Sequence, residues 1–179
     1  ALPGETIRAG IMKCKKNYGF ARLLEVLEPS PDRVEPRCPS ARPCGGCTLQ
    51  HLSYNAQLIY KENKVKNCLT RIGGVELSTV EWLPILGMQE ETPWHYRNKA
   101  QFPVREQLEE NGKFSAVAGF YAGHSHRVIP MTDCAIQAPI MRTILEIVLV
   151  WMENNDIPAY NEEHQTGLVR HIYIRTGYH

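Results

Sequence analysis

Alternating apolar and polar positions at the front of the chain predict two short β-strands. Ile7, Ala9 and Ile11 fall on one face of residues 5–14, which is the period-two pattern of a half-buried strand. A second strand is predicted from Phe20 to about Leu27. Three prolines between residues 29 and 36 then interrupt the pattern. Residues 1–36 are therefore expected to form a small β unit that is too short to close a barrel.

Apolar residues at helical spacing predict two helices. The first covers residues 54–72, with Ser53 placed to cap its N-terminus and Gly73 at its end. The second starts at Pro139, runs to about Glu153, and is apolar enough that we expect it to be buried. The apolar stripe of the first helix consists of Leu58, Val65, Leu69 and Ile72.

Residues 96–104 predict a strand with two unlike faces. Its apolar side carries Tyr96, Ala100, Phe102 and Val104, and its polar side carries Arg97, Lys99 and Gln101. Asn111 and Gly112 mark a hairpin turn to a partner strand over residues 116–122. Further strands are predicted at residues 128–129 and 168–175. The pattern as a whole indicates an α+β fold, with a mainly antiparallel sheet and two main helices.

Six cysteines raise the question of a metal site. Cys38, Cys44 and Cys47 form a C-x5-C-x2-C run stiffened by prolines and turned by two glycines. Cys134 is the best candidate for a fourth ligand, and the spacing leaves both zinc and an iron–sulfur cluster open. Cys14 and Cys68 are expected to be buried small apolar side chains.

Charge is unevenly distributed along the 179 residues. The formal net charge is +1, which excludes a protein that binds nucleic acid through bulk charge alone. Residues 5–72 nevertheless carry a net +6 and residues 73–179 a net −5. Arg97, Lys99 and Gln101, next to aromatic side chains, suit RNA, and Arg170, His171 and Arg175 could extend that surface. An ordinary solvated polar face remains the alternative.

Several other classes of protein lack support in the sequence. No glycine-rich nucleotide or S-adenosylmethionine motif occurs, and the histidines form no catalytic arrangement with an aspartate. The apolar stretch over residues 135–152 is too short and too charged for a transmembrane helix. The N-terminus lacks a signal-peptide pattern, so a cytoplasmic location is expected. Because the chain begins with Ala1, we expect it to come from a longer protein.

Motifs spread along the chain resemble one protein family. The most specific is Cys44-Gly45-Gly46-Cys47 with the Thr48–Leu52 segment that follows it. Supporting motifs are Pro3-Gly4-Glu5, Lys15–Tyr18, Pro36–Pro39, Tyr54–Gln57, Arg71–Gly74, Tyr96–Phe102 and Leu168–His171. Together they resemble the front part of the bacterial TRAM-containing, iron–sulfur RNA uracil-C5-methyltransferases, which modify 23S ribosomal RNA.

The resemblance implies a specific organisation. Residues 1–36 would be a truncated TRAM domain, a partial OB-like β-barrel, and residues 37–179 a cluster-binding and RNA-binding central region. Cys38, Cys44, Cys47 and Cys134 would hold a 4Fe–4S cluster, and Arg97, Asn98, Lys99 and Gln101 would face RNA. S-adenosylmethionine and the catalytic residues would belong to a later domain, so no residue of this chain is expected to be catalytic and the fragment alone is expected to be inactive.

The family also predicts an unpartnered surface. Its segment corresponding to residues 56–90 packs on the catalytic domain, so the stripe of Leu58, Val65, Leu69 and Ile72 should be exposed here or covered by a second copy of the chain. Two other hypotheses stay open: a freestanding RNA-binding module with a four-cysteine zinc site, and a protein-interaction domain. The sequence does not determine which uridine is modified or whether the RNA is ribosomal or transfer RNA.

Overall fold

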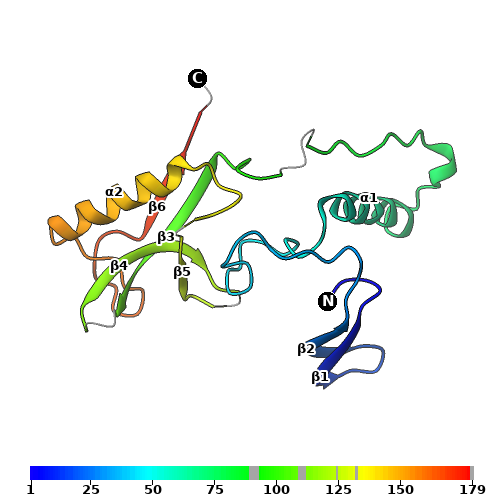
Figure 1. Ribbon diagram of the computed structural model, residues 1–179, viewed down its shortest axis with the longest axis horizontal. Coiled ribbons are helices and arrows are strands. Elements are labelled where there is room, and N and C mark those ends of the chain that lie inside the picture. The colour runs from blue at the N-terminus through cyan, green and yellow to red at the C-terminus, as the bar shows by residue number, and fades with distance from the viewer. Residues whose placement is uncertain (89–92, 109–111, 124, 132, 178–179) are drawn as a thin grey trace. The chain divides into compact units, whose positions relative to one another are not determined.

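The computed structural model describes residues 1–88, 93–108, 112–123, 125–131 and 133–177 (Figure 1). The chain forms two compact units. The first unit contains Ala1–Glu35 and Leu49–Gly87, and the second contains Pro36–Thr48 and Met88–His179. The sequence predicts a division near residue 36, but residues 49–87 cluster with the first unit rather than the second.

The first unit begins with an antiparallel hairpin of β1 (Thr6–Cys14) and β2 (Gly19–Glu28). Nearly every residue of both strands is exposed, and Ile11 retains 76% of its accessible surface. The prediction of a half-buried first strand is therefore wrong, because no second layer of described residues covers either face of the hairpin. No closed barrel forms within the described part of this unit.

The rest of the first unit is built around α1 (Tyr54–Arg71), followed by a short 3-10 turn, η1 (Leu77–Thr79). The Ser53 hydroxyl accepts a hydrogen bond from the Ala56 N–H at 3.4 Å, so the predicted N-cap is confirmed. The Ser53 N–H donates to the Asp32 carbonyl at 2.9 Å, which ties the start of the helix to the segment that follows the hairpin.

The second unit contains a four-stranded antiparallel sheet in the order β5–β4–β3–β6. Its strands are β3 (Lys99–Leu108), β4 (Phe114–Tyr121), β5 (Val128–Pro130) and β6 (His171–Arg175). One face of the sheet packs against α2 (Ile140–Asn154), as Figure 1 shows. The predicted antiparallel α+β pattern is thus observed, and the turn residue Asn111 lies outside the described residues.

The core of the second unit lies between the sheet and α2. Phe102 and Val104 of β3 are fully buried against Met141, Leu145 and Met152 of the helix. Burial of side chains this large supplies most of the stability of a domain of this size. The apolar side predicted for residues 96–104 is therefore confirmed for Ala100, Phe102 and Val104, whereas Tyr96 precedes the strand and is exposed.

The predicted burial of the second helix is confirmed for one face only. Met141, Leu145 and Met152 are buried, but Ile147 and Trp151 on the outer face are more than half exposed. Burial is also predicted for Cys14 and Cys68, and both are exposed, because each lies on an element that no described residue covers on that side. Among the described residues, no helix is long and apolar enough to cross a membrane.

Candidate functional site

Four of the six cysteines, Cys38, Cys44, Cys47 and Cys134, lie in the second unit and are half-buried. Backbone pairing holds the loop that carries the first three against the sheet. Cys44 forms a β-bridge with Ala122, and the Gly45 N–H donates to the Tyr121 carbonyl at 2.9 Å. A Cβ atom at Gly45 would lie only 3.0 Å from that carbonyl oxygen, so glycine permits the close approach.

The electrostatics of these thiols show that they influence one another. Burial raises the pKa of the Cys44 thiol, and the neighbouring Cys47 and Cys38 raise it further. Burial also raises the pKa of Cys134, and Cys38 and Cys47 again add to the shift. The metal-free thiols therefore favour the protonated form.

Backbone N–H groups point at two of the sulfur atoms. The Gly46 N–H donates to Cys44 Sγ at 3.4 Å, and the N–H groups of Ile136 and Gln137 lower the pKa of Cys134. Donors of this kind stabilise a thiolate, the form that binds metal. In the described part of the chain no group of three or more His, Cys, Asp or Glu residues is arranged closely enough to hold a metal ion as it stands. Cysteine thiolates are nevertheless the usual ligands of structural zinc and of iron–sulfur clusters, so the chemistry of these side chains is compatible with either group.

The segment after Cys134 pairs directly with the segment before β3. The His95 N–H donates to the Ala135 carbonyl at 2.9 Å, and the Arg97 N–H donates to the Ile136 carbonyl at 2.9 Å. The Ala138 N–H returns a bond of 3.0 Å to the Arg97 carbonyl. One backbone ladder therefore connects the fourth cysteine to the predicted RNA-facing residues.

On the side of the sheet opposite α2, the end formed by Lys99, Gln101, Tyr173 and Arg175 is exposed; we call these four residues the open sheet face. The register places Lys99 opposite Arg175, and Gln101 opposite Tyr173. All four side chains are exposed and alternate with the buried residues of the same strands. Like charges directly opposite each other destabilise a sheet, so the Lys99–Arg175 pair disfavours folding unless an anion binds there.

Tyr173 is a member of this face that sequence reasoning missed. It is 58% exposed on the open sheet face, beside the basic residues. The alternation of residues 171–175 could have identified it. Tyr173 is in phase with His171 and Arg175, whereas Ile172 and Ile174 face the core. An exposed tyrosine among cations offers a stacking surface for a nucleobase.

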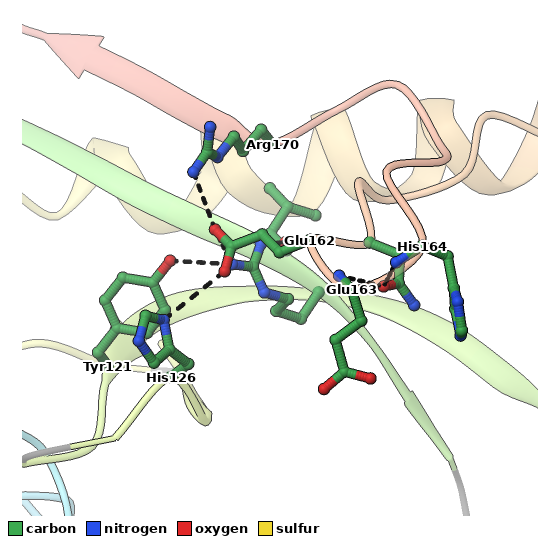
Figure 2. A network of polar contacts seen from close by, with 9 residues as sticks. Tyr121, His126, Glu162, Glu163, His164 and Arg170 are labelled. Atoms are coloured by element: carbon green, nitrogen blue, oxygen red, sulfur yellow. Dashed lines mark hydrogen bonds and ion pairs between the residues drawn. The ribbon is translucent and has the colours of Figure 1, made fainter.

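The structure separates Arg170 from the other predicted RNA-facing residues. Its guanidinium donates to the Glu162 carboxylate at 3.0 Å, as does that of Arg105 at 2.8 Å (Figure 2). Burial raises the pKa of Glu162, but hydrogen bonds from Arg170 and Arg105 outweigh this effect and lower it overall. Burial lowers the pKa of the nearby His171, and the two arginines lower it further, which favours the neutral imidazole.

A pocket of about 520 Å³ lies next to this cluster, within the second unit. Its wall includes Tyr121 and His126, together with Gly45 and Gly46 of the cysteine loop. Tyr121 also accepts a hydrogen bond from Arg105 at 3.1 Å through its hydroxyl. The cysteine loop therefore lines the same pocket as Tyr121, which contacts Arg105, and His126, which contacts Glu162.

Comparisons with known proteins point to one class. The chain is 47% identical to an uncharacterized RNA methyltransferase of Halalkalibacterium halodurans over 99% of its own length. It is 41% identical to an uncharacterized RNA methyltransferase of Clostridium tetani over the same share. The chain spans only 37% and 36% of these two curated relatives. No family model matches the chain. Over its whole length the chain is therefore homologous to one section of proteins named as RNA methyltransferases.

One solved structure is similar to the chain over nearly its whole length. The Pyrococcus abyssi tRNA (uracil-54, C5)-methyltransferase, determined with S-adenosyl-L-homocysteine, matches 99% of this chain and 37% of its own chain. The TM-score is 0.63 and the sequence identity 25%. This structural neighbour is a uracil-C5 enzyme, the same type that the sequence motifs resemble.

Proposed function

We propose that the chain is the RNA-binding, iron–sulfur section of an S-adenosylmethionine-dependent RNA uridine-C5 methyltransferase. The observation that carries this proposal is the match of 99% of the chain to the Pyrococcus abyssi uracil-C5 enzyme. The names of the two bacterial relatives support it. Methyl transfer and S-adenosylmethionine binding belong to the longer enzyme, and we assign neither to a residue of this chain.

In this proposal Cys38, Cys44, Cys47 and Cys134 hold a 4Fe–4S cluster. Support comes from their half-buried positions in one unit and from the N–H groups directed at Cys44 and Cys134. When bound, the cluster supplies iron–thiolate bonds that cross-link the cysteine loop to the segment after β5. The cluster then serves to position the open sheet face, and no redox step is proposed.

The open sheet face is the proposed RNA-binding surface. Arg97, Lys99 and Arg175 provide exposed cations at this end of the sheet. Arginine and lysine contact phosphates, while an amide such as that of Gln101 reads base edges. Asn98 is exposed before β3, in phase with Ala100, and we propose that it contacts RNA beside this face. We propose a ribosomal RNA as substrate, and the transfer RNA specificity of the structural neighbour makes tRNA the necessary comparison.

RNA affinity of charge variants tests the proposal. Replacing Arg97 and Lys99 together with alanine should weaken binding of a uridine-containing RNA stem-loop about tenfold or more at fixed salt. The dependence of log K on log salt should also flatten by roughly one for each phosphate that the protein no longer neutralises. The matched control is Arg142→Ala, since Arg142 is an exposed cation on α2, on the other side of the sheet, paired with Glu146 at 2.8 Å.

The control variant should bind RNA as the unaltered chain does. Equal affinities for all variants would contradict an RNA-binding role of the open sheet face and would favour a protein-interaction domain. Parallel titrations with ribosomal and transfer RNA stem-loops would rank the two substrate classes.

A further inference from the structure

Glu162 lies close to nitrogen-bearing side chains from three parts of the second unit. Its carboxylate lies 2.8 Å from Arg105 of β3 and 3.0 Å from Arg170, which precedes β6. His126 Nδ1 lies 3.6 Å from the other carboxylate oxygen. Figure 2 shows Arg170 and His126 directed toward the Glu162 carboxylate, with α2 on the far side of the sheet. One carboxylate thus occupies a place where two guanidinium groups converge.

Arg105 is held more firmly than the carboxylate that it binds. Arg105 donates to the Val104 carbonyl at 2.9 Å and to the Tyr121 hydroxyl at 3.1 Å, and its side chain is 17% exposed. Arg170 lies over the ring of Tyr160, 5.5 Å from its centroid. Glu162 instead stands on a turn closed by the pairing of Asn161 with Thr166. An anion from outside can therefore replace it without moving a strand.

Guanidinium groups bind carboxylate and phosphate with the same forked geometry, so the two anions compete for one place. The position is also continuous with a nucleotide-sized space, because Tyr121 and His126 line the pocket of about 520 Å³ beside it. A base attached to a phosphate at the two arginines would find an aromatic wall within this pocket.

We propose that Arg105 and Arg170 bind one phosphodiester group of RNA, and that Glu162 occupies this subsite in the free protein. The inference rests on the proposed RNA-binding function and extends it to Arg105, Glu162 and His126. RNA binding then exchanges an internal carboxylate for a phosphate, which disfavours weak, non-specific contacts at this end of the open sheet face.

The test compares two adjacent charge removals in the 179-residue chain. Glu162→Gln keeps the size of the side chain but removes the competing charge. Glu163→Gln removes the same charge from a carboxylate that points away from the cluster in Figure 2 and takes part in none of its contacts. Binding of a uridine-containing RNA stem-loop is measured for both at fixed salt. Glu162→Gln should bind about two- to fivefold more tightly than Glu163→Gln.

A second variant, Arg170→Ala, tests whether tighter RNA binding by Glu162→Gln requires the arginine pair or follows from the change in net charge alone. Arg170 is largely exposed, so Arg170→Ala should fold, and it should weaken RNA binding. In the Arg170→Ala background, the gain from Glu162→Gln should shrink, because part of the subsite is missing. Equal affinities for Glu162→Gln and Glu163→Gln, or a gain that persists undiminished without Arg170, would overturn the inference.

The proposed function and the phosphate subsite fail in distinguishable ways. If the unaltered chain bound no RNA, or if Arg97→Ala/Lys99→Ala had no effect, the proposed function would be contradicted and this inference with it. If that double variant bound RNA more weakly while the two glutamine variants remained equal, only the phosphate subsite would be wrong.

Discussion

Glu5 is the residue on which the contacts at the start of the first unit converge. Its carboxylate accepts hydrogen bonds from the Leu2 N–H at 2.6 Å and the Ser30 N–H at 3.3 Å, and from an Arg33 side-chain nitrogen at 2.8 Å. These bonds connect the N-terminus to the segment that follows the hairpin. The hydrogen bond from Arg33, partly opposed by burial, lowers the pKa of Glu5 from 4.5 to about 2. No motif in the sequence pairs Glu5 with Arg33, which lies 28 positions away.

The pKa of Glu5 predicts an acid transition in the first unit. Because the folded-state pKa of about 2 lies below the ordinary value of 4.5, the unfolded chain binds more protons between these values. The stabilisation is fully present above pH 4.5 and is lost as the pH falls through about 2. Glu5→Gln should remove this contribution, which denaturant unfolding at a series of pH values will measure.

The control for Glu5 is Glu28→Gln. Glu28 accepts a hydrogen bond from the Thr6 hydroxyl at 2.7 Å but is exposed. Glu5→Gln should change the slope of stability against pH between pH 2 and 4.5 more than Glu28→Gln does. The same slope for Glu5→Gln and the unaltered chain would contradict the role given to Glu5.

Gly119 shows a second constraint at the scale of one residue. A Cβ atom there would lie 1.9 Å from the Ile129 carbonyl oxygen in the neighbouring strand β5. Gly119→Ala should therefore displace β5 and lower the free energy of unfolding by about 1–3 kcal/mol or more. Gly123→Ala is the control, since a Cβ atom there meets nothing within 4 Å. Equal unfolding free energies for the two variants would show that β5 does not pack as described.

At the scale of elements, two of the four residues in the apolar stripe of α1 are exposed. Val65 is 52% exposed and Ile72 is 85% exposed, whereas Leu58 and Leu69 are half-buried. Leu58 contacts the segment near Gly87, and this contact accounts for part of the burial of Leu58. The expectation of an exposed stripe is thus confirmed for Val65 and Ile72. Packing of residues 56–90 on a catalytic domain, or on a second copy, remains a prediction.

The exposed end of the stripe predicts a small effect of substitution. Ile72→Lys should change the free energy of unfolding by less than about 0.5 kcal/mol, since the side chain is already in water. Leu145→Ala, in the core between α2 and the sheet, should cost about 2–5 kcal/mol. Denaturant unfolding measures both. A large loss of stability for Ile72→Lys would show that the stripe is covered.

Sedimentation of the same variant tests self-association. If two copies of the chain cover the stripe, the unaltered chain will dimerise with concentration and Ile72→Lys will not. A chain that is monomeric at every concentration would leave the exposed side chains available for another domain and would contradict self-association.

Elements with a strong local signal were predictable from the sequence, and their surroundings were not. Period-two alternation identified the buried side of β3, because Phe102 and Val104 must face a core. The strand predicted for residues 96–104 begins too early, because Arg97 pairs with Ile136 and the pairing with β6 starts at Lys99. That pairing depends on residues about 40 positions away. The exposed face of α2 was missed for the same reason, because apolar composition does not say which side a sheet will cover.

In the candidate site too, residues close together in the sequence were predictable, and those brought together by the fold were not. Cys38, Cys44 and Cys47 are close in sequence, so their spacing indicates a common site. Arg97, Lys99 and Gln101 were found by alternation within one strand. Arg105 and Glu162 were missed, because only the sheet register and the turn at residues 161–166 bring them together with Arg170.

At the scale of the whole molecule, the second unit combines a cysteine loop and a basic sheet face. The Cys44–Ala122 bridge attaches the loop to the end of β4, and the ladder of residues 95–97 with 135–138 attaches Cys134 to the start of β3. A metal cluster held by the four cysteines would therefore fix both ends of the surface that we propose for RNA. The net charge of +1 does not reveal this surface, because acidic residues elsewhere cancel it.

Metal analysis of the anaerobically purified chain is the decisive test of the four-cysteine site. We expect a brown protein containing iron and acid-labile sulfide in equal amounts, and loss of both in Cys44→Ser and in Cys134→Ser. Cys68→Ser is the matched control, since Cys68 is exposed on α1, and it should keep the iron. A colourless protein that contains zinc without iron would contradict the iron–sulfur proposal and would favour a four-cysteine zinc module.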